Sequence, residues 1–409
     1  MKKRYVATMI TLVQLVAMSN YKNVEVSAST LPTGTQISSN SSNSSNSSNL
    51  TTVLNIAVAE NAQIFTYDEA LQMAINNNAG LQELISSMEL LVDQRDTLYD
   101  AIIEMHGMTP FTGMGRGAVA QQIIALRELD TAISNAPLNR QMIEDAADLT
   151  LTNFLTTAKG LELDLAMLDA TIAINQTALN NTRLMLSLGL ESETNVINAE
   201  SRLAQLRSNR DTLTIALQNQ NLALNHFLGL PANAIVHVEH YVNVGQFTID
   251  LDRHIATALN TAPSVMTQRR ALDQAVFAEE QHQMFSMFTI NPQTGEILST
   301  DTSYTRISAD INSASRALQN SRDNLENAIR QTYNQLRQLE ELAASLQLDV
   351  EQAQRNYIIA RASYKAGIIT RFEAEQAQLG ILNAEIALAR NANNYNLLLL
   401  QFQYAYLIA

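Results

Sequence analysis

The stretch YKAGIITRFEAEQAQLGILNAEIALARNANNYNLLLLQFQYA, residues 364–405, decides the fold. It contains the turn sequence Ala366-Gly367-Ile368, followed by mostly apolar residues at heptad spacing. The heptad positions after the turn are Ala374, Ala377, Ile381, Ala384, Leu388, Asn391, Tyr395, Leu398, Phe402 and Ala405. An apolar repeat of about 3.5 residues, held this long, is typical of helices packed as a left-handed coiled coil. We therefore expect one long helix to reach the glycine and a second long helix to leave it.

An earlier stretch, residues 185–227, repeats this pattern 178 positions before it, behind the turn Leu188-Gly189-Leu190. Its heptad positions are Val196, Ala199, Leu203, Leu206, Arg210, Leu213, Leu217, Gln220, Leu224 and Phe227. In both sets only Arg210, Gln220 and Asn391 are polar, and we interpret them as residues that fix helix register rather than contact a substrate. The repetition predicts an all-α fold of duplicated long α-helical hairpins, with at most short β-hairpin segments.

Each half also begins with the same kind of capped helix. Thr66 and Glu69 form a capping box ahead of a helical apolar pattern, and Asp250 stands in the place of Thr66 184 residues later. Pro137 should kink or break the helix that contains it, because proline lacks the amide hydrogen of that turn. Further helices are expected at about 82–104, 119–187, 264–284 and 305–366.

Composition divides the chain into five segments. Residues 1–28 carry a basic start, an apolar run and small residues at the end, the pattern of a cleavable secretory signal. An uncleaved N-terminal anchor is the alternative. Residues 29–62, with repeated Ser-Ser-Asn, predict a low-complexity tether. The other segments are a first helical repeat at 63–230, a connection with a short strand at 231–249 and a second helical repeat at 250–409.

Three short pieces interrupt the helical pattern. Residues 234–244 alternate in polarity and predict a short edge strand lying across the helices. Residues 284–304 predict a small β-hairpin, because Pro292 and Gly295 lie between two apolar runs. Residues 105–118 are rich in glycine and predict an irregular connection.

Composition also argues against several classes of function. The chain has no cysteine and a formal net charge of −14, which excludes thiolate chemistry and makes a nucleic-acid role unfavourable. No nucleophile, phosphate-binding or metalloprotease motif is present, so we expect neither an enzyme nor a cofactor. His237 and His240 do not predict a metal site, because residues three apart on a strand face opposite sides. The adjacent acids Glu340 and Glu341 predict a solvated helix face.

These features together resemble the TolC, or outer-membrane efflux protein, family. The resemblance covers about residues 63–409. It rests on the Glu69-Ala70-Leu71 helix start, the two glycine turns, the Asn198-Ala199-Glu200 and Glu375-Gln376-Ala377 sequences after them, and the Leu228-Gly229 close of the first half. No one motif is specific, but their duplicated order is.

The resemblance implies a homotrimer in which twelve helices form a hollow cylinder that carries small molecules outward. It implies partners as well, a periplasmic-type membrane-fusion adaptor and an inner-membrane pump, and a location in the cell envelope, in the outer membrane if a barrel forms. The residues implied at the adaptor-contacting tip are Gly189, Leu190, Ser192, Gly367, Ile368 and Thr370.

The sequence departs from the family in the segments that close a trimeric membrane barrel. A membrane strand needs about 9–11 residues, which residues 105–118 cannot supply twice and residues 284–304 barely can. Whether a barrel forms, and so whether the protein inserts into a membrane, is left open. A hypothesis from another class is a non-conducting coiled-coil scaffold of the cell envelope. The Asn- and Gln-rich helix faces favour a wet lumen over such a spacer.

Two charged residues after the second turn are candidates for a gate or selectivity site in the lumen. Three-fold symmetry would turn Glu373 into a ring of carboxylates that selects cations, and Arg371 could pair across the closed tip. The alternative is structural, because Thr370 and Glu373 have the spacing of a capping box. Both roles are compatible with the sequence.

Overall fold

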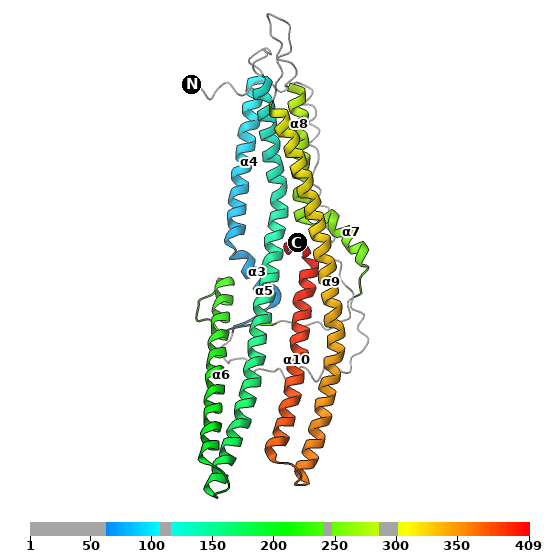
Figure 1. Ribbon diagram of the computed structural model, residues 1–409. Helices are drawn as coiled ribbons and strands as arrows, with labels where there is room; N and C mark the ends of the chain where they lie inside the picture. Colours follow the sequence, from blue (N-terminus) through cyan, green and yellow to red (C-terminus); the bar gives the residue numbers. More distant parts are fainter. Residues whose placement is uncertain (1–62, 107–115, 240–247, 286–301) are drawn as a thin grey trace, which may run out of the picture.

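The structure of the protein is a computed structural model that describes residues 63–106, 116–239, 248–285 and 302–409. Long helices run along one axis, and shorter elements lie at mid-height (Figure 1). The elements in chain order are β1 (Gln63–Thr66), α3 (Tyr67–Asn76), α4 (Ala79–His106), α5 (Arg116–Ser187), α6 (Glu193–Phe227), β2 (Val236–Glu239), α7 (Leu251–Thr261), α8 (Pro263–Phe285), α9 (Thr302–Lys365), α10 (Arg371–Gln403) and the 3₁₀ turn η1 (Ala405–Leu407). The prediction of long paired helices is confirmed.

Both expected hairpins are present, α5–α6 and α9–α10, and their turns lie at the same end of the molecule (Figure 1). Gly189 and Gly367 have φ angles of 70° and 72°, in the left-handed region that residues with a Cβ enter at a cost. In each turn the N–H after the glycine bonds a carbonyl five residues back, Leu190 to Met185 and Ile368 to Ser363, both at 2.9 Å. The backbone of each turn therefore requires the glycine.

The heptad positions form the seam of each hairpin. Of the twenty positions, all are buried or half-buried except Arg210. The side chains of Arg210, Gln220 and Asn391 donate across the seam to Asp169 Oδ1, the Phe154 carbonyl and the Leu339 carbonyl, at 2.5, 3.1 and 3.0 Å. These bonds are consistent with a role in setting helix register.

The first short helix of each repeat covers the open end of its hairpin. In the first repeat, Ala70 of α3 lies in one core cluster with Leu224 of α6. In the second repeat, His254 of α7 stacks on Phe402 of α10 with ring centroids 4.5 Å apart. The capping boxes expected at Thr66 and Thr370 are both formed. Equivalent residues of the two sequence repeats thus occupy equivalent places in the fold.

The sheet at mid-height differs in part from expectation. The predicted strand is present as β2, but its partner β1, directly before α3, was not predicted. The two strands are parallel, with Gln63 opposite Val236 and Thr66 opposite Glu239. Most of the expected β-hairpin at 284–304 and of the irregular piece at 105–118 lies outside the described residues.

A kink or a break was expected at Pro137, and the break is wrong, because α5 continues through the proline. Pro137 is exposed, so its ring projects from the helix into solvent. A proline disrupts hydrogen bonds in the preceding turn. Arg270 of α8 donates to the Ser134 carbonyl and to Asn135 Oδ1 in that turn, so the neighbouring helix contacts α5 just before the proline.

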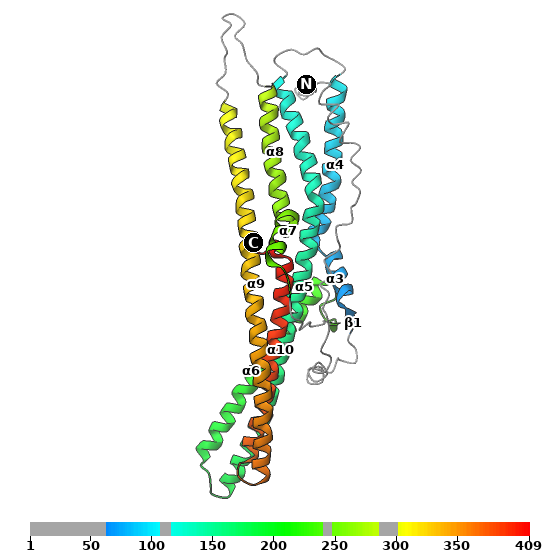
Figure 2. The same ribbon diagram turned by 90° about the vertical axis from the view of Figure 1, so that its right-hand side faces the viewer.

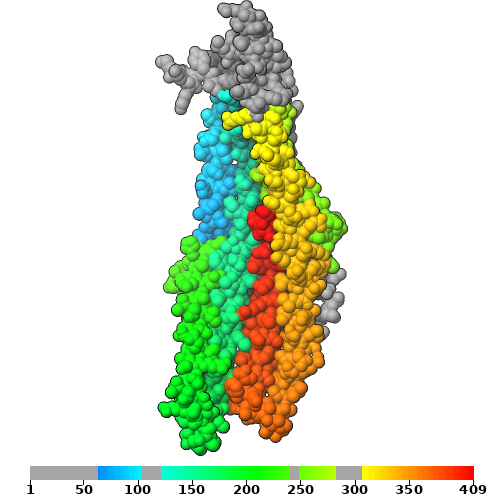
Figure 3. Space-filling view, viewed as in Figure 1, coloured from blue at the N-terminus to red at the C-terminus, as the bar shows by residue number. Residues whose placement is uncertain are grey.

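The two repeats meet along α5, which packs against α10 and against α8. In the half of the molecule that bears the turns, α6, α5, α10 and α9 lie side by side, with α6 at one edge and α9 at the other (Figures 1 and 3). In the side view the first hairpin leans away from the second towards the turns (Figure 2). Among the helices that the structure describes, none combines the length and the apolar character needed to cross a membrane.

Candidate functional site

The tips of the two hairpins present apolar side chains to solvent. Leu190 is 69% exposed and Ile368 is 76% exposed, each directly after its turn glycine, and Leu188 is exposed as well. A Cβ added at either glycine would meet no atom within 4 Å, so both turns are open to their surroundings. The tips are therefore hydrogen-bonded turns that carry exposed leucine and isoleucine side chains.

The remaining predicted tip residues hold the helices that leave the turns. Ser192 Oγ accepts from the Asn195 N–H at 3.3 Å and caps α6. Thr370 Oγ1 accepts from the Glu373 N–H at 3.2 Å and caps α10. Each hydroxyl thus pairs a backbone N–H in the first turn of its helix.

The two gate candidates have partners within their own helix. Glu373 accepts from the Thr370 N–H at 2.7 Å, and this backbone bond lowers the pKa of the Glu373 carboxyl. Arg371 Nε donates to Glu375 Oε1 at 2.6 Å, and that hydrogen bond raises the pKa of Arg371. The capping interpretation of Glu373 is confirmed, and both residues are exposed in the single chain.

The two hairpins are joined between α5 and α10. Leu163 of α5 is packed in one cluster with Ile386 and Ala389 of α10. Arg390 of α10 forms an ion pair with Asp164 of α5 at the same level. These contacts join the two hairpins.

A cluster of tyrosines and aspartates near mid-height was not predicted from the sequence. Tyr67 of α3 and Tyr404 both donate to Asp148 of α5, the second at 2.9 Å, and Tyr406 of η1 donates to Asp145. Burial raises the pKa of the Asp145 carboxyl and of all three phenols. The cluster ties the start of the first repeat and the end of the second to one helix.

The prediction that Glu340 and Glu341 both lie on a solvated helix face is right for Glu341 and wrong for Glu340. Glu341 is exposed, but only 17% of the Glu340 side chain is exposed. Glu340 accepts from Arg337 Nη1 at 2.6 Å and from the Tyr395 hydroxyl of α10 at 3.0 Å. It is therefore part of the α9–α10 contact.

Both edge helices carry apolar side chains that are exposed in the single chain. We call Ile197, Ile215 and Leu222 of α6 the first edge. We call Leu342, Leu348, Ile358 and Ile359 of α9 the second edge. α6 packs mainly against α5, and α9 packs against α10, α8 and α7. Among the residues that the structure describes, none covers these side chains fully.

In the described part of the chain, no group of three or more His, Asp or Glu side chains could hold a metal ion. His237 lies on β2 and is exposed, whereas His240 is outside the described residues.

Comparison with protein-family models gives no match, and comparison with curated proteins gives none either. Solved structures do match. The outer membrane protein VceC of Vibrio cholerae has a TM-score of 0.60 at 13% identity, over 83% of this chain and 96% of its own. The outer-membrane channel OprN has a TM-score of 0.61 at 13% identity, over 83% and 89%. The CmeC outer membrane channel of Campylobacter jejuni has a TM-score of 0.57 at 13% identity, over 83% and 85%.

These matches cover 83% of this chain and accord with its duplicated hairpins and glycine turns. At 13% sequence identity these matches establish the fold, and they do not establish the activity. The chain has the fold of the TolC-family outer-membrane efflux channels.

Proposed function

We propose that this chain is the exported subunit of a trimeric, TolC-like efflux conduit that passes small molecules outward together with an adaptor and a pump. The shared fold supports a channel role, and the signal-like residues 1–28 support a place in the cell envelope. The observation that carries the proposal is the pair of uncovered apolar edges. An enzyme is not supported, because the structures it resembles are channels.

Exposed apolar residues of the first edge and of the second edge lie at similar distances from the glycine turns along the long axis. Ile197 lies eight residues past Gly189, and Ile359 lies eight residues before Gly367. Ile215 and Leu342 lie 26 and 25 residues from the same two turns. Because a helix rises about 1.5 Å per residue, each pair stands at nearly one level. Copies placed edge to edge would bury these side chains against each other, and three copies would close a ring around a wet centre.

The tips supply the surface proposed for the adaptor. Leu190 and Ile368 are apolar and exposed on turns that the capping residues hold rigid. An apolar side chain on a rigid turn suits docking, because little conformational entropy is lost when it is covered. Arg371 and Glu373 lie at the start of α10, just after the second tip. In the trimer each would occur three times around the lumen, where the three copies would form a gate or selectivity ring.

The ring arrangement is tested by disulfide cross-linking, which is specific here because the chain has no cysteine of its own. A chain carrying both Ile197→Cys and Ile359→Cys should give covalent trimers as the largest product after mild oxidation. Chains carrying only one of the two cysteines provide the control and should remain single on a non-reducing gel. Products larger than trimers, or equal products from the single variants, would contradict the edge-to-edge ring.

The scaffold hypothesis is separated from the conduit by the shape of the assembly. End-on class averages of the purified protein in electron microscopy should show a hollow centre for a conduit. A solid bundle or a single elongated chain would favour the non-conducting scaffold.

The adaptor surface is tested by placing a charge on each tip. Leu190→Asp together with Ile368→Asp should reduce in vivo cross-linking to an adaptor, identified by mass spectrometry, by tenfold or more. Ile235→Asp, an exposed isoleucine away from the tips, is the matched control. Equal adaptor recovery from both variants would rule out the tips as the docking surface.

A further inference from the structure

In the half of the molecule away from the glycine turns, α4 and the first half of α9 lie at opposite sides. The helices α4, α5, α8 and α9 follow one another across this half, with α4 on one side and α9 on the other (Figures 1 and 2). α4 packs mainly on α5, and this part of α9 packs mainly on α8. Each of the two outer helices therefore leaves the face opposite its neighbour without a packed partner helix in the described part of the chain.

The unpartnered face of α4 is acidic. Its four exposed acids follow one another at intervals of four, three and four residues, which places them on one side of the helix. We call Glu89, Asp93, Asp96 and Asp100 the acidic face. Leu91, Leu98 and Ile102 are buried or half-buried on the opposite side of α4. Arg95 pairs with Asp96, whereas the other three acids have no hydrogen-bond or ion-pair partner among the described residues.

The unpartnered face of α9 carries arginine in its first half, residues 302–330. Arg306 and Arg316 are exposed, and we call them the arginine face. Arg316 donates to the Asn312 carbonyl of its own helix at 3.2 Å and forms no ion pair in the described part of the chain. Leu325 and Ile329 lie on the side of α9 opposite Arg316 and belong to the core. The arginines are thus directed away from the packed side.

The two helices differ in net charge. Residues 79–106 of α4 hold six acids and one arginine, whereas residues 302–330 of α9 hold four arginines and three acids. Two α4 helices brought face to face would repel each other, while α4 against α9 would attract. Charge therefore favours contact between the unlike faces of two copies. Such a contact is head-to-tail and can close into a ring.

Contacts between neighbouring helices show which residues stand at one level along the long axis. Arg95 Nη1 of α4 is 3.9 Å from Asp130 Oδ1 of α5. The next residue of α5, Thr131, donates to Gln274 Oε1 of α8 at 3.4 Å. Arg95 and Gln274 therefore stand at about the same level.

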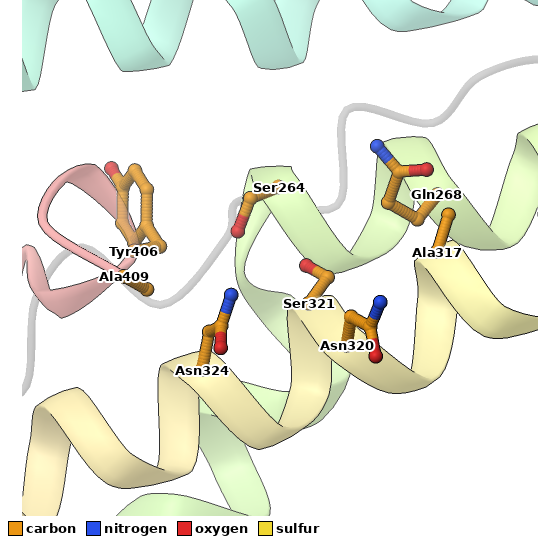
Figure 4. A pocket seen from close by; sticks show the side chains of 8 residues that line it. All are labelled: Ser264, Gln268, Ala317, Asn320, Ser321, Asn324, Tyr406 and Ala409. Carbon is orange, nitrogen blue, oxygen red and sulfur yellow. The ribbon is translucent and has the colours of Figure 1, made fainter.

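The level is carried on to α9 by the residues around a hollow between α8 and α9. Gln268 of α8 and Ala317 of α9 line this hollow side by side (Figure 4). α8 and α9 run in opposite directions, so six residues further along α8, at Gln274, correspond to six residues earlier on α9. Position 311 of α9 thus stands at the level of Arg95.

We propose that the acidic face of α4 binds the arginine face of α9 in a second copy of this chain. Counted from the level of Arg95, Asp100 stands opposite Arg306, and Asp93 stands within one helical turn of Arg316. Copies related by rotation about the long axis keep these levels. The second copy is the favoured occupant because its arginine face matches the acidic face in both charge and position.

This pairing extends the contact proposed for the first and second edges, and it rests on that proposed ring. α9 is one continuous helix that carries the arginine face in its first half and the second edge in its other half. α4 begins beside the end of α6, where Asn77 Nδ2 donates to the His226 carbonyl at 3.0 Å. The acidic face therefore continues from the helix that carries the first edge. What it adds is that charge selects which faces meet.

The first test measures the salt dependence of a disulfide cross-link. Ser86→Cys on α4 and Asn320→Cys on α9 are exposed, stand at one level on the count above and remove no charge. A chain carrying both should link to its neighbours after mild oxidation in about 0.1 M salt. In about 1 M salt, where charges are screened beyond about 3 Å, the yield should fall at least fivefold. The apolar Ile197→Cys and Ile359→Cys pair should link equally in both.

The second test reverses the charges in the chain that carries the Ser86 and Asn320 thiols. Asp93→Arg with Asp100→Arg should lower the cross-link yield at least fivefold, because arginine would then face arginine. Arg306→Asp with Arg316→Asp should do the same. All four substitutions in one chain restore the attraction and should return the yield to within twofold of the parent, a recovery that misfolded variants could not show.

Asp68→Arg with Glu239→Arg is the control, because it reverses two exposed acids outside both faces and should leave the yield unchanged. Equal loss in this control, or no recovery when all four charges are exchanged, would overturn the pairing. If the thiols at 86 and 320 do not link while those at 197 and 359 do, this inference fails and the ring stands. If neither pair links, both fail together.

Discussion

The imidazole of His254 stacks on Phe402 inside the core cluster that closes the second hairpin. Burial lowers the pKa of His254 below its ordinary value of 6.5, and a hydrogen bond to the Phe402 backbone opposes that effect only in part. The neutral ring is therefore the form that packs. Protonation would place a positive charge against Phe402 and the apolar residues around it.

We predict that this histidine makes the second repeat less stable in mild acid. The unfolded chain takes up the proton first as pH falls through about 6.5, because its histidine has the higher pKa. The contribution of His254 is thus complete above that pH and declines on the way down to the folded-state pKa. Thermal unfolding at pH 7.5 and pH 5 measures the decline.

His254→Phe is the matched variant, because it keeps the stacking and removes the titration. The difference in melting temperature between the two pH values should be smaller in His254→Phe than in the parent protein. Asp145, whose pKa is raised, acts in the opposite direction in both proteins and so cancels from the comparison. Equal pH dependence in the two proteins would show that His254 is not responsible.

For single residues, the sequence predicts those side-chain contacts whose two partners are close together in the chain. The capping boxes at Thr66 and Thr370 were readable, because both partners lie within four residues. The hydrogen bond from Tyr404 to Asp148 was not, because 256 residues separate the two and nothing local marks either as paired. The tip and gate roles of residues around Gly189 and Gly367 stay predictions.

At the scale of elements, the glycine turns require a residue without a Cβ, whereas the long helices are more stable with alanine than with glycine. Gly367 has φ of 72°, a region in which a Cβ is strained, whereas Gly160 lies inside α5 with no atom within 4 Å of an added Cβ. We predict that Gly367→Ala lowers the free energy of unfolding by about 1 kcal/mol. Gly160→Ala should raise it by roughly 0.5–1 kcal/mol, because alanine favours the helix.

Chemical denaturation of the full chain measures both changes. Gly367→Asn serves as a further control, since asparagine tolerates left-handed backbone better than alanine does, and it should cost less than Gly367→Ala. The same sign for the changes at 160 and 367 would contradict the difference in backbone demand.

The elements themselves were largely predictable, because a heptad repeat and a glycine turn are local signals that extend over many residues. Two elements were not. β1 has four residues and forms only because β2 lies beside it, so no local pattern marks it. α5 remains continuous at Pro137, where Arg270 of another helix contacts the preceding turn, and no rule for a single helix anticipates that contact.

For the molecule as a whole, the junction between α5 and α10 joins the two hairpins. Leu163 is 1% exposed there and is packed with Ile386 and Ala389. We predict that Leu163→Ala lowers the free energy of unfolding by about 3 kcal/mol, through lost apolar burial and a remaining cavity. Leu348→Ala on the second edge should change it by under about 0.5 kcal/mol in a single chain.

Amide hydrogen exchange shows which helices are destabilised by Leu163→Ala. Exchange in α5 and α10 around this junction should accelerate in Leu163→Ala, while the tips keep their parent rates. Equal destabilisation by the two leucine variants would mean that the hairpins are not held at this point. The sequence did not identify this junction, because the seam pattern specifies which helices pair within a hairpin and not which hairpin faces meet.

The parallel pairing of β1 with β2 has a consequence for the order of assembly. Gln63 stands opposite Val236, so this pairing encloses all of α3, α4, α5 and α6 in one loop of the chain. A contact across so long a loop gains little until the intervening helices have come together. The first hairpin should therefore form before the strand that precedes it in the chain is fastened, so that the beginning of the described fold is among the last of its parts to settle.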